Sequence, residues 1–166
     1  MVNSISSAVL IRGTRVPTVS CRILHVTDDD ADHHLFVQTL KADSAIVVER
    51  LHSGVETLRV LRARASHELP SLIIIPSLLP LLTGIEFIHE IKSDDRLQVI
   101  PVIVFAATLP EGEAARLYEA GAACVVYKGG DLDAYERAIR SFQKFWIDIA
   151  ILPSAGEESP VRGRPD

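Results

Sequence analysis

Residues 69–85 read LPSLIIIPSLLPLLTGI and contain no charged side chain. A run of this length approaches that of a membrane-spanning helix. Three prolines interrupt it, at Pro70, Pro76 and Pro80, and proline breaks the interior of a helix. We therefore interpret the run as a strand over residues 72–75 followed by a loop. Since this strand is apolar throughout, we expect it to be buried on both faces, as strands of parallel sheets are.

Short apolar runs on either side of this strand alternate with helical patterns. We predict the other strands at residues 22–27, 45–49, 101–105 and 123–127. We predict helices from residues 28–30 to 41, from Ser53, from Gly84 to Lys92, from near Pro110 to Gly121, and from Asp131 to about Ile149. Five βα units in about 130 residues predict an α/β fold with a parallel sheet and helices on both faces. We expect one domain over residues 21–150, an N-terminal extension over 1–20 and a C-terminal tail over 151–166.

The composition excludes several classes of protein. The 166 residues are 48% hydrophobic and carry a net charge of −5, which argues against a disordered chain and against a general nucleic-acid binder. The sequence predicts no membrane segment and no signal peptide, so we expect a cytoplasmic location. We expect the two cysteines, Cys21 and Cys124, to be free thiols, because small secreted scaffolds are much denser in cysteine.

The carboxyl ends of parallel strands meet at one edge of a sheet, and this edge is where we expect the functional crevice. The residues expected there are 27–29, 76–77, 106–108 and 128–130. Their charged side chains are those of Asp28, Asp29 and Lys128. We predict that Asp28 pairs with Lys128, because a paired charge is tolerated where a lone buried charge is costly. We predict that Asp29 and Asp30 cap the helix that follows.

Several segments resemble response-regulator receiver domains, the CheY-like family. The segments that carry the resemblance are the first strand with its acidic turn (23–29), the third strand with its loop and helix (72–80 and 84–88), the fourth strand (101–106) and the fifth (121–128). Together they cover residues 21 to about 145. The resemblance implies a flavodoxin-like, doubly wound five-stranded parallel sheet in the order 2-1-3-4-5.

Several positions depart from what the resemblance implies, among them Gly129, where a proline usually follows the lysine. Receivers take a phosphoryl group on an aspartate that ends the third strand, and Pro76 stands at that position. Thr27 replaces one acid of the metal-binding turn, Ala106 replaces the hydroxyl residue that ends the fourth strand, and Val125 replaces the aromatic switch residue. Lys128 is retained. Because proline has no side-chain oxygen, we predict an atypical receiver, or pseudo-receiver, that has no catalytic residue and is not phosphorylated on aspartate.

We expect no cofactor and no metal ion at this edge of the sheet. Magnesium is held by carboxylates together with phosphate oxygens and water, and Asp28 with Asp29 make at most a weak site. Ser77 lacks the neighbouring base that a substitute acceptor needs. The sequence contains no nucleotide-binding glycine motif and no catalytic motif, so nothing in it supports an enzyme of flavodoxin-like architecture. The alternative to a pseudo-receiver is a small-molecule- or metal-binding regulator that uses the altered crevice.

The last predicted helix carries a seam of large apolar side chains at spacings of three and four residues. We predict that its second half is the interface of a homodimer, because large apolar groups beyond the sheet would otherwise be exposed. The predicted interface residues are Ile139, Phe142, Phe145, Trp146 and Ile149. Residues 145–147 and 151–153 resemble the C-terminal extension of small single-domain response regulators associated with bacterial phytochrome histidine kinases. This resemblance implies a stand-alone protein of two-component signalling that binds a histidine kinase or another signalling protein.

Overall fold

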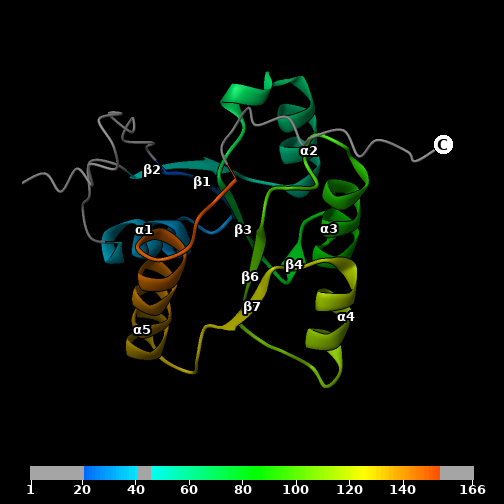
Figure 1. Cartoon of the computed structure of the whole chain (residues 1–166). Helices are drawn as coiled ribbons and strands as arrows, with labels where there is room; N and C mark the ends of the chain where they lie inside the picture. Colours follow the sequence, from blue (N-terminus) through cyan, green and yellow to red (C-terminus); the bar gives the residue numbers. More distant parts are fainter. Residues whose placement is uncertain (1–20, 41–45, 154–166) are drawn as a thin grey trace, which may run out of the picture.

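A computed structural model describes residues 21–40 and 46–153 (Figure 1). The predicted extension over residues 1–20 and most of the predicted tail lie outside the described residues. Parallel strands form one sheet in the order β2 (Ile46–Leu51), β1 (Cys21–Val26), β3 (Leu72–Pro76), β6 (Val102–Ala106) and β7 (Cys124–Tyr127). Counted along the chain, the strands of this sheet have the predicted order 2-1-3-4-5, so that prediction is confirmed.

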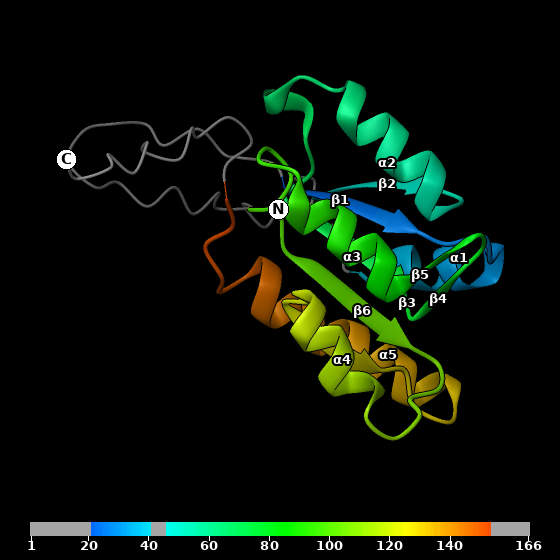
Figure 2. The same cartoon turned by 90° about the vertical axis from the view of Figure 1, so that its right-hand side faces the viewer.

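Helices cover both faces of the sheet, as Figure 1 and Figure 2 show. On one face lie α1 (Asp30–Thr39) and α5 (Leu132–Phe142). On the other lie α2 (Gly54–Ala63), α3 (Gly84–Ser93) and α4 (Glu113–Ala120), with a short 3-10 helix, η1 (Ser66–Glu68), after α2. The predicted doubly wound α/β fold is therefore confirmed. None of the helices within residues 21–40 and 46–153 is long and apolar enough to span a bilayer.

The central strand β3 is buried on both faces, as predicted. The side chains of Leu72 and Ile74 lie in the core beneath α1 and α5. Those of Ile73 and Ile75 lie in the core beneath α2, α3 and α4. Successive side chains of a strand point to opposite faces, so an unbroken apolar run supplies both cores at once.

The segment after β3, which we predict as a loop, contains a short antiparallel hairpin. Its strands are β4 (Leu78–Leu79) and β5 (Leu82–Thr83). The hairpin closes on Gly84, whose backbone N–H donates to the carbonyl oxygen of Ser77 at 3.2 Å. A Cβ at residue 84 would lie 2.8 Å from that oxygen, so this approach requires glycine. The sequence gives no sign of the hairpin because its inward and outward side chains are both apolar, which removes the alternation typical of a strand.

The last helix is shorter than predicted. It begins after its N-cap Asp131, as predicted, but the α-helical hydrogen bonding ends at Phe142 and not near Ile149. A π-helical turn, η2 (Gln143–Ile147), follows it directly. The apolar spacing of three and four residues continues through this turn, which is why the sequence pattern does not reveal the change.

Both cysteines are free, as predicted. Cys21 begins β1 and Cys124 begins β7, and strands β3 and β6 lie between them in the sheet. Burial raises the pKa of both thiols. Neither cysteine is therefore activated as a nucleophile at neutral pH.

Candidate functional site

The two central strands of the sheet end in residues without a side-chain oxygen. Pro76 ends β3 and Ala106 ends β6. Ala106 is fully buried, whereas Pro76 is partly exposed. Val125, opposite Val104 in the β6–β7 pair, packs at the margin of the core beneath α2, α3 and α4. At the three positions that the resemblance assigns to the acceptor, hydroxyl and aromatic residues, the chain therefore presents only aliphatic side chains.

The acidic turn after β1 uses its polar groups for local hydrogen bonds. Thr27 Oγ1 accepts a hydrogen bond from the backbone N–H of Asp29 at 3.2 Å. The Asp29 carboxylate accepts from the backbone N–H groups of Ala31 at 2.8 Å and Asp32 at 3.1 Å. Asp29 is thus the N-cap of α1, as predicted, because it satisfies N–H groups that have no partner within the helix.

Arg50, near the end of β2, ties this turn to its neighbouring strand. Its Nε donates to the carbonyl oxygen of Thr27 at 3.0 Å, and its Nη1 donates to Asp30 Oδ1 at 2.6 Å. Asp30 is the first residue of α1, and its carboxylate forms an ion pair with Arg50. The prediction that Asp30 caps the helix is wrong, because Asp29 alone is the N-cap. Arg50 Nη2 is buried and has no hydrogen-bond partner among the residues that the structure describes.

Lys128 pairs with Asp32, and the predicted pair with Asp28 is wrong. Lys128 Nζ lies 2.5 Å from Asp32 Oδ1, and the Tyr135 hydroxyl donates to the same oxygen at 2.7 Å. Asp28 is exposed, and no residue in the described part of the chain forms a hydrogen bond or an ion pair with it. Lys128 pairs with Asp32 because Asp32 lies on the inner side of α1, which also carries the buried Phe36. Asp28 lies instead in the exposed turn before the helix.

Asp32 is a functional candidate that strand-end reasoning does not find, because it lies inside a helix. A signal for it does exist in the sequence. Asp32 is three residues before Leu35 and four before Phe36, so it shares their face of the helix. A carboxylate on the apolar face of a helix is rarely buried unless it is paired.

Two histidines extend this group of side chains, which we call the Asp32 cluster (Asp32, His25, His33, Lys128 and Tyr135). His25, in β1, is buried, and its Nε2 lies 3.5 Å from Asp32 Oδ2. Its Nδ1 lies 3.1 Å from Nδ1 of His33. The cluster therefore joins β1, α1, α5 and the end of β7 through polar contacts on one face of the sheet.

Burial and hydrogen bonding shift the pKa values in the Asp32 cluster. Burial alone would raise the pKa of Asp32, but hydrogen bonding with His25, Lys128 and Tyr135 outweighs it and holds this pKa well below the usual range. Burial, together with the bond to Asp32, raises the pKa of Tyr135. Burial lowers the pKa of His25, although Asp32 opposes the shift. We assign the proton of a neutral His25 to Nε2, facing Asp32, which leaves its Nδ1 to accept from His33.

The residues at the strand ends do not fit a divalent cation. Magnesium needs several oxygen ligands at once. Pro76 supplies no side-chain oxygen, the Asp29 carboxylate caps α1, and the Thr27 hydroxyl accepts from a backbone N–H. Within the described ranges, no group of three or more His, Cys, Asp or Glu side chains is placed to hold a metal.

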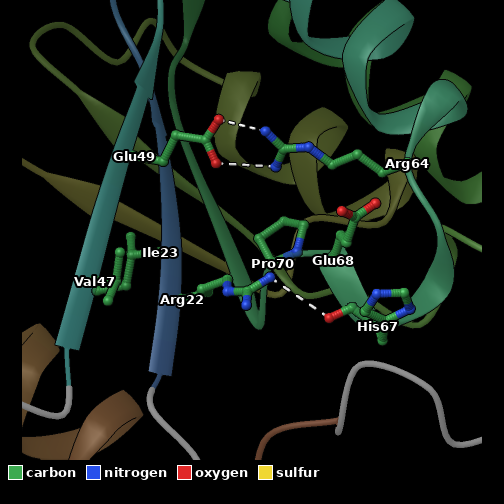
Figure 3. Close-up of a pocket in the computed structure, with 8 residues that line it drawn as sticks. All are labelled: Arg22, Ile23, Val47, Glu49, Arg64, His67, Glu68 and Pro70. Carbon is green, nitrogen blue, oxygen red and sulfur yellow. Dashed lines mark hydrogen bonds and ion pairs between the residues drawn. The ribbon is translucent and has the colours of Figure 1, made fainter.

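Among the residues that the structure describes, clefts border the sheet at opposite ends. A cleft of about 560 Å³ lies at the carboxyl ends of the strands, between the first turns of α1 and α5, and is lined by Asp32, Lys128 and Tyr135 among others. A cleft of about 460 Å³ lies near the amino ends of β1 and β2. Figure 3 shows that Glu49 and Arg64 face each other there through two hydrogen bonds. The first cleft adjoins the candidate site, because Asp32, Lys128 and Tyr135 line it.

The predicted dimer interface divides into a buried and an exposed part. Ile139 and Phe142 are only 0% and 3% exposed and lie in the core beneath α1 and α5. The prediction that these two side chains form an interface is therefore wrong, because the sheet of their own domain covers them. Trp146 is partly buried against the same core. Phe145 and Ile149 are 53% and 63% exposed, so they are accessible to another molecule.

Comparison with known proteins identifies the family. The family model for the response regulator receiver domain matches residues 23–152. Response regulator Rcp1 of Synechocystis sp. is 29% identical over 139 residues, which are 80% of this chain and 93% of Rcp1. The polar-differentiation response regulator DivK of Brucella abortus is 28% identical over 120 residues, which are 72% of this chain and 94% of DivK.

Solved structures show the same arrangement. The crystal structure of the phosphorylated cyanobacterial phytochrome response regulator RcpA matches with a TM-score of 0.74 at 29% identity, over 81% of this chain and 99% of RcpA. The Mn(2+)-bound form of Rcp1 matches with a TM-score of 0.73 at 28% identity, over 80% of this chain and 99% of Rcp1. The chain therefore belongs to the response regulator receiver domain family of two-component signalling and is related to the phytochrome response regulators.

Proposed function

We propose that this receiver acts by binding other proteins and is not phosphorylated on aspartate. The observation that carries the proposal is Pro76, which ends β3 where the resemblance puts the acceptor aspartate. An acyl phosphate forms on a carboxylate oxygen, and the proline side chain is a hydrocarbon ring. No phosphoryl group can therefore be attached at this position.

The neighbouring residues support the same proposal. A phosphoryl signal would act through a hydroxyl residue and an aromatic residue, and Ala106 and Val125 stand at those positions. Lys128, the residue that the resemblance gives as retained, is held by Asp32 and lies 4.8 Å from the ring centroid of Tyr135. Each part of the switch that the resemblance implies is thus replaced or engaged elsewhere.

We further propose that the protein forms a homodimer in the cytoplasm and binds a phytochrome-type histidine kinase or another signalling protein. Support for the dimer comes from the exposed Phe145 and Ile149, together with Ile151, whose side chain is fully exposed. Support for the kinase comes from the relationship to Rcp1 and RcpA, since RcpA is described as a phytochrome response regulator.

The test of the first proposal is treatment of the full chain with acetyl phosphate and Mg²⁺, followed by intact-mass spectrometry. We expect no added phosphate, whereas a receiver that retains the acceptor aspartate should gain one in the same experiment. A hydroxylamine-sensitive gain of one phosphate by this chain would contradict the proposal.

A regulator that binds a small molecule is a second candidate, favoured by the cleft of about 560 Å³ beside Lys128. Its polar lining of Asp32, Lys128 and Tyr135 would suit a ligand with both hydrogen-bond donors and acceptors. A thermal-shift screen of small metabolites tests it. A stabilising compound must lose its effect in a Lys128→Met variant, and failure of every compound to shift Tm would count against this candidate.

A further inference from the structure

The hairpin that follows Pro76 presents two leucines to solvent. Leu79 points inward and is buried, whereas Leu78 is 72% exposed and Leu81 is 90% exposed. Pro80 and Leu81 form the two-residue turn between β4 and β5. Single exposed leucines are common on proteins, but two on one short hairpin form a concentrated apolar projection.

Leu81 also has an unfavourable backbone conformation. Its φ is 66°, and it is the one residue other than glycine with a positive φ among those described. A left-handed backbone places the Cβ of an L-residue too close to the following carbonyl oxygen, so a turn with this φ after proline ordinarily takes glycine or asparagine. Because the Leu81 side chain is almost fully exposed, no packing within the chain offsets this strain.

The base of the hairpin is held by a backbone hydrogen bond and by packing against α2. The N–H of Gly84 donates to the Ser77 carbonyl at 3.2 Å. On the inner side, a Cβ built at Gly54 would lie 3.1 Å from Leu82 and 3.3 Å from Leu79, so the start of α2 packs tightly on the hairpin. The outward leucines therefore project from a hairpin whose base is packed against the start of α2.

Two exposed carboxylates lie in the segments that follow the neighbours of β3. Asp28 follows β1 and Glu111 follows β6, and these strands are the two neighbours of β3 in the sheet. Asp28 and Glu111 are exposed, and neither forms a hydrogen bond or an ion pair with any residue of the described ranges. The cations of this edge, Arg50 and Lys128, are already paired with Asp30 and Asp32. A partner that covers this edge would therefore gain by supplying positive charge.

We propose that Leu78 and Leu81 form a docking surface for a partner protein, through a segment that carries exposed apolar side chains next to Lys or Arg. A strained residue that serves no contact within its own fold is expected at a functional position. The inference rests on the proposed function in one respect, namely that binding occurs without phosphorylation.

The test uses a library of random peptides displayed on phage and selected against the full chain without any phosphodonor. We expect the selected peptides to combine apolar residues with Lys or Arg. In the Leu81→Gly variant, the Kd of such a peptide should rise by about tenfold or more, because an interface leucine is lost. The same variant should have a Tm that is higher by roughly 4 °C, because the strain is relieved. Val99→Ser is the matched control, since Val99 is a half-exposed apolar residue before β6, at the other end of the sheet.

Several outcomes would overturn the inference. They are selected peptides that are acidic, peptides that bind Leu81→Gly as tightly as the wild type, and an unchanged or lowered Tm in that variant. Loss of a homodimer in Leu81→Gly, measured by light scattering, would make a second copy the occupant and would also overturn it. Peptides that bind at the hairpin only after phosphodonor treatment would refute the proposed function but support this surface. Peptides that bind away from the hairpin without phosphodonor would refute this surface but support the proposed function.

Discussion

The Asp32 carboxylate connects elements that are far apart in the sequence. One of its oxygens accepts hydrogen bonds from Lys128 and Tyr135, and the other faces His25. The side chains of Asp32 and Lys128 are 10% and 16% exposed, so water provides little compensation for either charge. Loss of one partner would leave the other charge nearly buried and unpaired, which is more costly than loss of an exposed ion pair.

We predict that Asp32→Asn lowers the free energy of unfolding by about 2–4 kcal/mol, because Lys128 then lacks its counter-charge. Urea unfolding followed by circular dichroism measures the change. Asp28→Asn is the control, since Asp28 is exposed and unpaired among the described residues, and it should change stability by no more than about 0.5 kcal/mol. Equal effects of the two substitutions would contradict the role of Asp32.

The buried His25 predicts a pH dependence of stability. Its pKa is lower in the folded protein than the value of about 6.5 in an unfolded chain. The unfolded state therefore binds more protons as the pH falls below about 6.5, and the protein should lose stability from there down to the pKa of folded His25. We expect the urea midpoint to fall over this range and to fall less in His25→Gln. His34→Gln, at an exposed position, should retain the full pH dependence.

At the scale of elements, α5 and the turn after it have different roles. The face of α5 that bears Phe142 completes the core, where its ring centroid lies 5.8 Å from that of Phe36 and 5.7 Å from that of Phe105. The turn η2 presents Phe145 to solvent, with its ring perpendicular to Trp146 at a centroid distance of 5.3 Å. We therefore expect substitution of Phe142 to affect mainly stability, and substitution of Phe145, three positions later, to affect mainly self-association.

We predict that Phe142→Ala lowers the free energy of unfolding by about 3–5 kcal/mol, because it leaves a cavity in the core. Phe145→Ser should change stability by less than about 1 kcal/mol but weaken self-association. Urea unfolding and light scattering, applied to both variants, separate the two effects. A dimer that is unchanged by Phe145→Ser would show that its interface lies elsewhere.

The hairpin β4–β5 and the strand β3 show what the sequence can predict about elements. The strand is predictable because four consecutive apolar residues between turn-forming residues have no other good location than the sheet interior. The hairpin is not predictable in this way, because apolar residues occupy its inner and outer positions alike. The hairpin also approaches Gly54 and Gly84 closely, and local patterns do not encode such tertiary contacts.

At the scale of the whole molecule, the predicted order of the strands is correct, and it places the ends of β1, β3, β6 and β7 at one edge. The pairing of Lys128 could not be predicted from that order alone. Asp28 and Asp32 are both near the end of β1, and only the angular position around α1 decides which of them faces Lys128. The same limit applies to Ile139 and Phe142, whose spacing fits a dimer seam and a core face equally well.

We predict that Pro76→Asp does not restore a phosphorylation-dependent change of structure. The variant gains a carboxylate, but Ala106 and Val125 still lack the hydroxyl and aromatic groups, and Lys128 remains bound to Asp32. Hydrogen exchange measured with and without beryllofluoride and Mg²⁺ should show no protection change beyond β3 and its loop. A change that spreads to α4 and β7, as large as that of a receiver with all these groups, would contradict the prediction.

Under the proposed function, Pro76 also affects how long a signal can last. A covalent phosphoryl mark disappears by hydrolysis, and its lifetime is a property of the marked protein. Under the proposed function, the active form of this receiver is a complex, so its lifetime is the reciprocal of a dissociation rate constant. The response would then follow the cellular concentrations of the receiver and its partner, and synthesis or degradation of either protein would replace a phosphatase as the means of ending it.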